Sequence, residues 1–173
     1  MEVFRHSHKT RYQVKIPSIM KVLFVCSSNV CRSPYCEFRF RKLMEETPEL
    51  AKKVSEVNSG AVFNISNKLH KKAYQCMLEE GYDENILKAH RAKYIWFNYK
   101  MFKDADVIIG MTRWHKWCLP FSLRKKYINL SEVGGGEYFA IPDPFLAKSQ
   151  VDYNKCMEIV GTYVDLYAST LTK

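Results

Sequence analysis

Residues 22–34 read Val-Leu-Phe-Val-Cys-Ser-Ser-Asn-Val-Cys-Arg-Ser-Pro, and this stretch decides the fold. Its first four residues are apolar, which is typical of a buried strand in a parallel sheet, and the strand ends at Cys26. Arg32 follows after five residues. Ser33 is a candidate N-cap, and Pro34 stands where proline is tolerated, in the first turn of a helix. The sequence therefore predicts a strand, a short loop and a helix over residues 34–46.

The loop between this strand and this helix has the parts of an oxyanion site. Five backbone N–H groups between Cys26 and Arg32 can curl into a nest around an anion, and the helix N-terminus adds partial positive charge. Arg32 can grip phosphate oxygens with two parallel N–H groups. The same positive field favours the thiolate form of Cys26, which is the nucleophilic form. The predicted phosphate-binding loop consists of Ser27, Ser28, Asn29, Val30, Cys31, Arg32 and Ser33.

Strand and helix patterns alternate along the rest of the chain. Further strands are predicted at residues 54–59, 106–111 and 127–130. Helices are predicted from about residue 69 to Gly81, over 94–103, shortly after Thr112 and over 151–171, and residues 134–136 are expected to form a flexible glycine loop. This order predicts a single-domain α/β fold, a doubly wound four-stranded parallel sheet with helices on both faces. Ligands of such sheets bind beyond the carboxyl ends of the strands, where Cys26 is expected.

Length and composition favour one globular domain. The chain has 173 residues, of which 47% are hydrophobic and 26% charged, and its apolar runs are shorter than the ~20 residues needed to span a bilayer. Residues 1–19 read as a basic extension, either a disordered segment, a partner strand or an artefact of start-site choice, and the domain is expected over 20–173. Six scattered cysteines form no secreted disulfide framework, which favours a reducing cytoplasm.

The net charge of +9 has two interpretations. It can steer anionic partners, or it can be an ordinary solvated surface. Because the chain contains no nucleic-acid-binding motif, we expect no nucleic-acid partner, and no membrane partner either. No cofactor and no metal ion are expected, since no paired ligand motif is present.

Asp143 is the candidate general acid, which a hydrolase needs in addition to a phosphate-binding loop. It lies in Ile141-Pro142-Asp143-Pro144, where two prolines fix the backbone on both sides of the carboxyl. A leaving group needs a proton, which a positioned carboxylic acid can supply. Taken alone, Asp-Pro is more typical of a turn.

The two motifs together resemble the low-molecular-weight protein tyrosine phosphatases. The resemblance covers about residues 20–172, and the family loop reads Cys-x-Gly-Asn-x-Cys-Arg-Ser-Pro, which this chain matches except that Ser28 replaces the glycine. The family fold is a four-stranded parallel sheet flanked by helices, as predicted above. The resemblance implies metal-independent hydrolysis of phosphotyrosine in proteins, with inorganic phosphate or other oxyanions also binding in the loop.

The resemblance also implies the catalytic roles. Cys26 would be the nucleophile that forms a phosphocysteine intermediate. Arg32 would clamp the phosphate, and Asp143 would act first as the acid and then as the base that activates water. Cys31 resembles the second loop cysteine of the family, which can protect the nucleophile through a reversible disulfide; a small buried side chain is an equally good interpretation.

Further residues match the family's loop support. Ser33 would donate a hydrogen bond to the thiolate. Asn29, Ser59 and His90 match a network that holds the loop in its strained shape, and His90 lies in Ala-His-Arg-Ala-Lys, similar to the family's His-x-Ala-Arg segment.

The implied substrate walls are Phe63, Phe145 and Leu146. Phe63 aligns with an aromatic wall of the family, and Phe145 takes one of two aromatic places after Asp-Pro while Leu146 takes the other. Stacking on a phenyl ring would favour phosphotyrosine. Val30 is branched and apolar, as in the tyrosine-specific members, whereas the related protein-arginine phosphatases carry threonine there.

Two further residues depart from the family pattern, and two alternative functions compete with hydrolysis. Ser28 would cost about a kcal/mol if its position needs a positive φ, and Thr112 stands where many members have aspartate. An arsenate reductase on the same fold would need two more relay cysteines, and Cys118 could be one, but Met111 occupies the place of the other. A phosphate- or phosphopeptide-binding module is the second alternative, although a binder needs neither a thiolate nor an acid.

Overall fold

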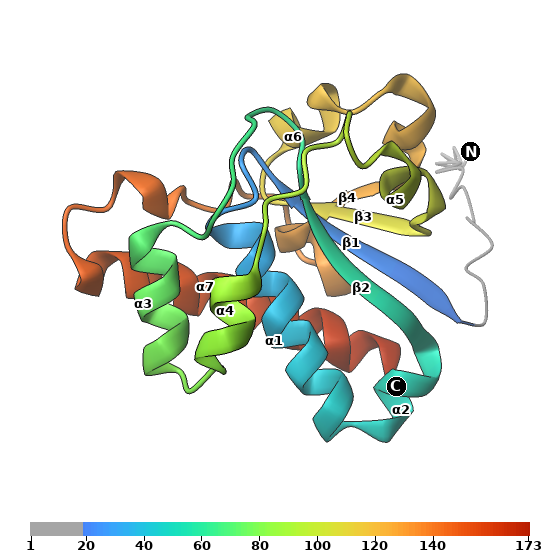
Figure 1. The fold of residues 1–173 in the computed structure, drawn as a ribbon. Helices are drawn as coiled ribbons and strands as arrows, with labels where there is room; N and C mark the ends of the chain where they lie inside the picture. The colour runs from blue at the N-terminus through green and yellow to red at the C-terminus, as the bar shows by residue number, and fades with distance from the viewer. Residues whose placement is uncertain (1–18) are drawn as a thin grey trace, which may run out of the picture.

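The sheet has four parallel strands in the order β2-β1-β3-β4. The computed structural model describes residues 19–173, and Figure 1 shows the arrangement. The strands are β1 (Met20–Cys26), β2 (Val54–Ala61), β3 (Val107–Gly110) and β4 (Tyr127–Asn129). This confirms the predicted α/β fold with one parallel sheet. The prediction of an N-terminal extension concerns residues 1–19. Of these, only Ile19 lies in the described part of the chain.

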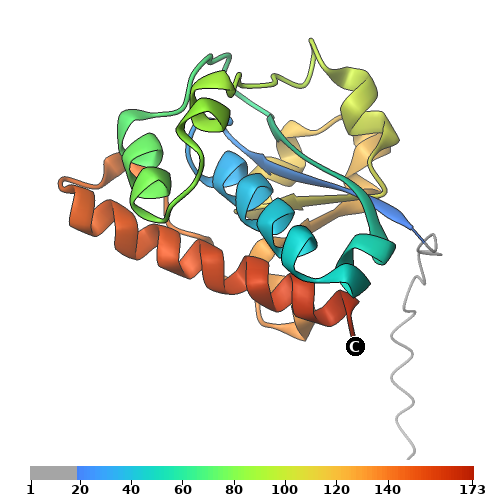
Figure 2. The same ribbon diagram turned by 60° about the horizontal axis from the view of Figure 1, so that its bottom comes forward.

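Helices cover both faces of the sheet. The helices against one face are α1 (Arg32–Glu46), α2 (Pro48–Lys53), α3 (Lys71–Glu79), α4 (Glu84–Ala89) and α7 (Gln150–Leu171). Those on the other face are α5 (Tyr99–Asp104), α6 (Arg113–Cys118) and the 3-10 helix η1 (Phe121–Lys126). Two further 3-10 turns, η2 (Leu130–Gly135) and η3 (Pro144–Leu146), lie between β4 and α7. Figure 2 shows α1 and α7 side by side along one face.

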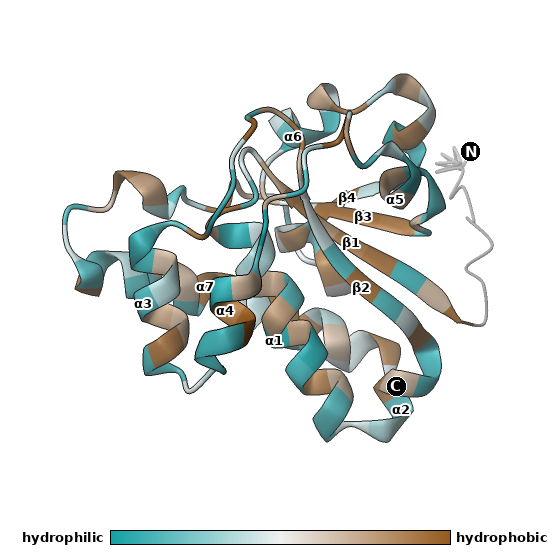
Figure 3. Cartoon of the chain, in the orientation of Figure 1, coloured by the Kyte–Doolittle hydropathy of each residue, from teal (hydrophilic) through white to brown (hydrophobic). Residues whose placement is uncertain are grey.

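Strand β1 divides the core in two because its side chains alternate between the faces. Val22 and Phe24 point into the cluster made with α1, α3 and α7. Leu23 and Val25 point into the smaller cluster under α5, α6 and η1. The central strands are apolar on both faces, as the hydropathy colouring in Figure 3 shows, which is the pattern of a doubly covered parallel sheet.

The first helix differs in detail from its prediction. It begins at Arg32, with Cys31 at the N-cap, so Ser33 is not the cap; its hydroxyl bonds to the loop instead. The helix ends before Pro48 as expected, but a second short helix, α2, begins at this proline, which is a favourable first helical residue. Strand β2 continues one residue past Gly60, the predicted stop.

The middle of the chain differs more. Helix α4 was not predicted; it is a single short segment capped by Asp83. Residues 94–98 were predicted to be helical, but the helix begins only at Tyr99. Tyr94 pairs with Ala61 at the end of β2, and the N–H of Ile95 donates to the Ala61 carbonyl at 3.0 Å. Because Tyr94 and Ile95 pair with the sheet, the helix cannot begin at these residues. Residues 134 and 135, predicted as flexible loop, belong to the 3-10 turn η2.

No helix in residues 19–173 is both long and apolar enough to cross a membrane.

Replacing Phe40 by alanine should destabilise the fold strongly. Phe40 is fully buried, and its ring lies 5.8 Å from Phe24 of β1 and 5.7 Å from Tyr167 of α7. Loss of such a side chain costs about 3–5 kcal/mol of unfolding free energy, measurable by urea titration. Leu146→Ala is the control, because Leu146 is exposed and should change stability by less than about 0.5 kcal/mol. Equal losses in both variants would contradict the packing described.

Candidate active site

The loop from Ser27 to Cys31 lies at the carboxyl end of β1, where ligands of parallel sheets bind (Figure 1). Within the described part of the chain, none of its five backbone N–H groups donates to a protein acceptor. Buried N–H groups normally find a partner. The loop therefore keeps a set of donors for an oxyanion.

Arg32 opens α1 at the same place and is almost fully buried. Its Nη1 donates to the carbonyl oxygen of Ile141 at 3.1 Å, and its Nη2 donates to Oδ2 of Asp143 at 2.7 Å. Its Nε is buried and has no partner among the described residues. Because an unsatisfied buried donor is costly, this N–H favours an anion in the loop.

Cys26 and Ser33 meet at the bottom of the loop. The distance from Sγ of Cys26 to Oγ of Ser33 is 3.0 Å. Ser33 Oγ already accepts a hydrogen bond from the side-chain amide of Asn29 at 2.9 Å, so its own proton is free to donate. The sulfur is closer to it than its other neighbour, the Gly60 carbonyl oxygen at 3.4 Å. Ser33 is thus placed to donate to a thiolate on Cys26.

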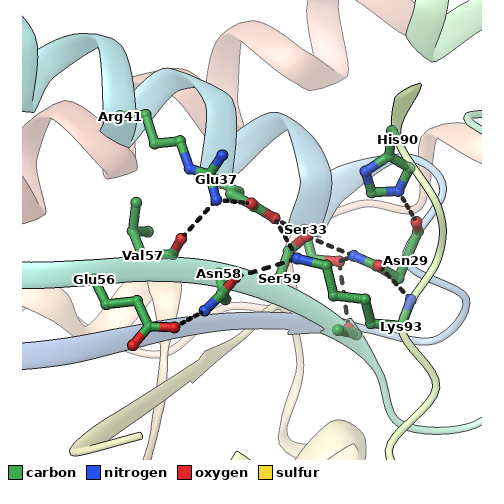
Figure 4. Close-up of polar contacts among 11 residues, drawn as sticks. Asn29, Ser33, Glu37, Arg41, Glu56, Val57, Asn58, Ser59, His90 and Lys93 are labelled. Atoms are coloured by element: carbon green, nitrogen blue, oxygen red, sulfur yellow. Dashed lines mark hydrogen bonds and ion pairs between the residues drawn. The ribbon is translucent and has the colours of Figure 1, made fainter. Parts of the chain in front are cut away.

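Asn29 is the centre of the loop's support (Figure 4). Its amide nitrogen donates to Ser33 and, at 2.7 Å, to Oγ of Ser59 on β2. Its amide oxygen accepts from the backbone N–H of Lys93 at 2.9 Å, and its backbone carbonyl lies 3.0 Å from Nε2 of His90. The structure thus brings together the four residues expected to support the loop.

Glu37 anchors this network, and the sequence reasoning missed it. Although charged, Glu37 is buried in α1 and accepts a hydrogen bond from Ser59. Its carboxylate also contacts the cations of Arg41 and, at 3.7 Å, Lys93 (Figure 4). A buried carboxylate needs such partners. A signal was available, because Glu37 stands one helical turn after Ser33 on the inner side of the same helix.

Backbone strain falls on Asn29 rather than on Ser28. Asn29 has a φ of 55°, and it is the only non-glycine residue in the described part with a positive φ. Asparagine tolerates this left-handed conformation better than most residues. The cost expected for Ser28 therefore does not arise. Ser28 instead accepts a hydrogen bond from the amide of Asn64 at 2.9 Å through its hydroxyl oxygen.

A pocket opens above Cys26, with Arg32 at its base and Asp143 on its rim. The apolar residues that line it are Val30, Phe63, Trp114 and Phe145. Phe63 is 55% exposed and packs edge-to-face on Trp114, with ring centroids 4.8 Å apart. Leu146, expected as a wall, is 82% exposed and does not line the pocket. Trp114 of α6 lines the pocket instead, and it was not predicted from the sequence.

His115, next to Trp114, fixes the side chain of Ser27. The N–H of Met111 donates to Nδ1 of His115 at 3.2 Å, so the ring proton is on Nε2, which lies 3.1 Å from Oγ of Ser27. Ser27 therefore accepts this bond and keeps its own hydroxyl proton for the pocket that it lines. Burial, and to a smaller extent the charge of Arg32, lowers the pKa of His115 from 6.5 to about 3.

The six cysteines are all free thiols. Burial is the main reason that the pKa of Cys31 is raised to about 12, which keeps this thiol protonated at neutral pH. A protecting disulfide between Cys26 and Cys31 stays a prediction. Within residues 19–173, no three His, Cys, Asp or Glu side chains come together as metal ligands.

Comparison with known proteins identifies the family. The family model described as low molecular weight phosphotyrosine protein phosphatase matches residues 21–173. The chain belongs to this family. The family's porcine phosphatase (Sus scrofa) is 34% identical over 153 residues, covering 83% of this chain and 93% of the relative. A protein-arginine-phosphatase from Bacillus subtilis is 29% identical over 129 residues, covering 73% and 80%.

Solved structures agree with this assignment. A cysteine-to-serine mutant of the YwlE arginine phosphatase, with a phosphorylated active-site serine, superposes with a TM-score of 0.74 at 26% identity, covering 89% of this chain and 97% of that one. A low-molecular-weight protein tyrosine phosphatase from T. tengcongensis gives a TM-score of 0.71 at 28% identity, covering 87% and 99%. The fold is thus shared with members named for two different substrates.

Asn29→Ala should lower the free energy of unfolding by about 3 kcal/mol. Alanine is disfavoured at positive φ, at about 1 kcal/mol, and the loss of the amide leaves buried partners unsatisfied, at about 1–3 kcal/mol. Asn29→Gly keeps the backbone conformation and loses only the hydrogen bonds, so urea unfolding should place it between the wild type and the alanine variant. A loss below about 0.5 kcal/mol for both would refute the anchoring role.

Stability should fall between about pH 6.5 and about pH 3 because of His115. In this window an unfolded histidine binds a proton while the folded His115, with its lowered pKa, stays neutral. The unfolded state then binds more protons, so stability decreases as the pH falls, by about 1.4 kcal/mol per pH unit. His115→Gln, which keeps a donor for Ser27, should flatten this profile in thermal unfolding. A parallel profile in wild type and variant would contradict the buried neutral ring.

Proposed function

We propose that this protein hydrolyses phosphotyrosine in proteins, without a metal ion, through a phosphocysteine intermediate. The observation that carries the proposal is the convergence of three groups: the Cys26 thiol, the buried Nε of Arg32, which has no partner within the described part of the chain, and the Asp143 carboxyl 2.7 Å from that guanidinium. A nucleophile, a phosphate clamp and a proton donor are the parts that this reaction needs.

In the first step the thiolate of Cys26 attacks phosphorus. The S–P bond forms as the bond from phosphorus to the tyrosine oxygen breaks. The loop N–H groups and Arg32 stabilise the charge on the phosphoryl oxygens. Asp143 gives its proton to the leaving phenolate. Because Arg32 has five N–H donors and uses two, it can hold Asp143 and the phosphate together.

In the second step water replaces the thiolate. The Asp143 carboxylate, now deprotonated, takes a proton from the water as its oxygen attacks phosphorus. The S–P bond breaks, inorganic phosphate leaves, and Ser33 donates to the restored thiolate. This returns the free enzyme with one phosphoester hydrolysed and one water consumed.

The pocket walls favour phosphotyrosine over phosphoarginine. Phe63, Trp114 and Phe145 offer ring faces and edges to a phenyl group. Val30, which also lines the pocket, presents only methyl groups to the substrate. An arginine phosphate would meet no polar partner at Val30. Relatives of both specificities are known, so this choice rests on the pocket.

The two alternatives from the sequence are not favoured. The family holds phosphatases, and the arsenate reductase relay lacks a cysteine at Met111, which is buried in the core. A binding module would not need Asp143 beside the phosphate site.

We also propose the cytoplasm as the compartment, since the six thiols are free.

Purified protein should hydrolyse para-nitrophenyl phosphate at mildly acidic pH in the presence of a chelator. Cys26→Ser should abolish turnover, because a serine hydroxyl is a far weaker nucleophile there. Asp143→Ala should slow substrates with poor leaving groups by about 100-fold or more and those with good leaving groups much less. Initial rates over a series of aryl phosphates measure this difference. Equal losses on good and poor leaving groups would remove Asp143 from the acid role.

Phosphotyrosine, phosphoarginine and phosphoserine peptides of one sequence should separate the substrate classes. We expect the highest kcat/KM with phosphotyrosine. Trp114→Ala should reduce it toward the phosphoserine value, and Leu146→Ala, outside the pocket, is the control. A preference for phosphoarginine in the wild type would overturn the substrate assignment while leaving the phosphatase chemistry intact.

A further inference from the structure

The segment 93–126, which contains α5, α6 and most of the layer on this face of the sheet, exposes all three tryptophans of the chain. Trp117 is 65% exposed, Trp96 60% and Trp114 47%, and the nearby Phe121 is 86% exposed. Large aromatic side chains are usually buried, and a group of exposed ones marks an interaction site more often than chance. Only Trp114 has a role in the pocket, so the others need a separate explanation.

Helix α6 connects this exposed surface to the pocket. Trp114 lines the pocket, and Trp117 follows three residues later, which places it on the same side of the helix about one turn away. Figure 1 shows α6 beside the loop that follows β1, and the contact between His115 and Ser27 fixes it there. A peptide whose phosphotyrosine occupies the pocket would therefore run close to Trp117.

Trp117 is held in place by Arg124 of η1. The guanidinium of Arg124 lies over the indole at 5.0 Å from the ring centroid. The same guanidinium donates to the carbonyl oxygens of Trp117 and Leu119, both at 2.9 Å. An aromatic side chain fixed in advance loses little entropy when a partner covers it. Trp117 thus has the properties of an interface anchor.

Trp117 and Lys116 both line two surface hollows. The first is bordered by Arg113, Tyr127, Asn129 and Glu132. The second is bordered by Phe121, Ser122, Arg124 and Lys125. Two hollows that share these lining residues suit successive side chains of an extended peptide.

The segment that carries this surface is strongly basic. Residues 93–126 contain eight Lys or Arg and two Asp, and so carry six of the nine net charges of the chain. Within the described residues, Lys116, Arg124 and Lys125 have no carboxylate within ion-pair distance. Unneutralised cations beside a substrate pocket attract and orient acidic segments.

We propose that the surface formed by Lys116, Trp117, Phe121, Arg124 and Lys125 binds an acidic segment of the phosphoprotein substrate next to its phosphotyrosine. One helical turn of about 5.4 Å corresponds to about two residues of extended chain. The acidic residues then lie about two to four positions from the phosphotyrosine. This proposal rests on the proposed function, because it specifies the sequence around the residue that is hydrolysed.

The test compares three phosphotyrosine peptides that differ only in flanking residues, which are acidic, neutral or basic at positions two to four. Wild-type kcat/KM should be about tenfold higher for the acidic than for the neutral peptide, and this preference should decline with added salt. Lys116→Glu and Trp117→Ala should each reduce the preference about threefold or more. Lys52→Glu, the same charge change on α2 of the opposite layer, should leave it unchanged. Hydrolysis of para-nitrophenyl phosphate should be unchanged in all three variants.

A second measurement separates this proposal from the proposed function. Equilibrium binding of the same peptides to Cys26→Ala, which has no acceptor atom for the phosphoryl group, reports the preference without turnover. If wild type fails to hydrolyse para-nitrophenyl phosphate but the acidic peptide still binds best, the function fails and the docking surface stands. Equal binding of all three peptides, or equal effects of Lys116→Glu and Lys52→Glu, would overturn the docking surface alone. Binding to phosphatidylserine vesicles that Trp117→Ala abolishes, without peptide preference, would overturn it in favour of a membrane surface.

Discussion

The left-handed backbone of Asn29 is the constraint on which the site depends. One side-chain amide joins β2, α1 and the segment before α5 by donating to Ser59 and Ser33 and accepting from Lys93. Because buried hydrogen bonds stabilise this otherwise unfavourable conformation, the loop is shaped before any substrate arrives. Its free N–H groups then face an anion without a cost of reorganisation.

The buried guanidinium of Arg32 connects the loop to the acid. It is anchored by Ile141 and paired with Asp143, so the segment after β4 is positioned by the first turn of α1. The Nε has no partner among residues 19–173, which is a cost in the free protein, and a bound phosphate removes that cost. The groups for nucleophilic attack and for proton transfer therefore meet through one side chain.

The sequence predicted the parts of the site that depend on local spacing. Cys26, Arg32 and the helix after them follow from strand-loop-helix geometry, and the parallel sheet follows from alternating patterns. Prediction from the sequence failed where packing between distant segments decides which residues line the site. Trp114 enters the pocket and Leu146 stays outside because of how α6 and η3 pack, which no spacing reveals. Residues 94–98 have a helical composition, but pairing of Tyr94 with Ala61 overrides it. The strain suspected at Ser28 falls on its neighbour, since the loop turns one residue later.

The central claim is that the phosphoryl group is bonded to the sulfur of Cys26 before water releases it. Rapid acid quenching tests this claim most directly. Asp143→Asn enzyme should be mixed with a phosphate ester that has a good leaving group, so that the intermediate forms but water attack is slowed. Mass spectrometry of the quenched protein should find one phosphoryl group on the peptide that contains Cys26, and none in Cys26→Ala treated in the same way. Turnover by the wild type with no phosphoryl group on this cysteine, or with one on another residue, would contradict the account.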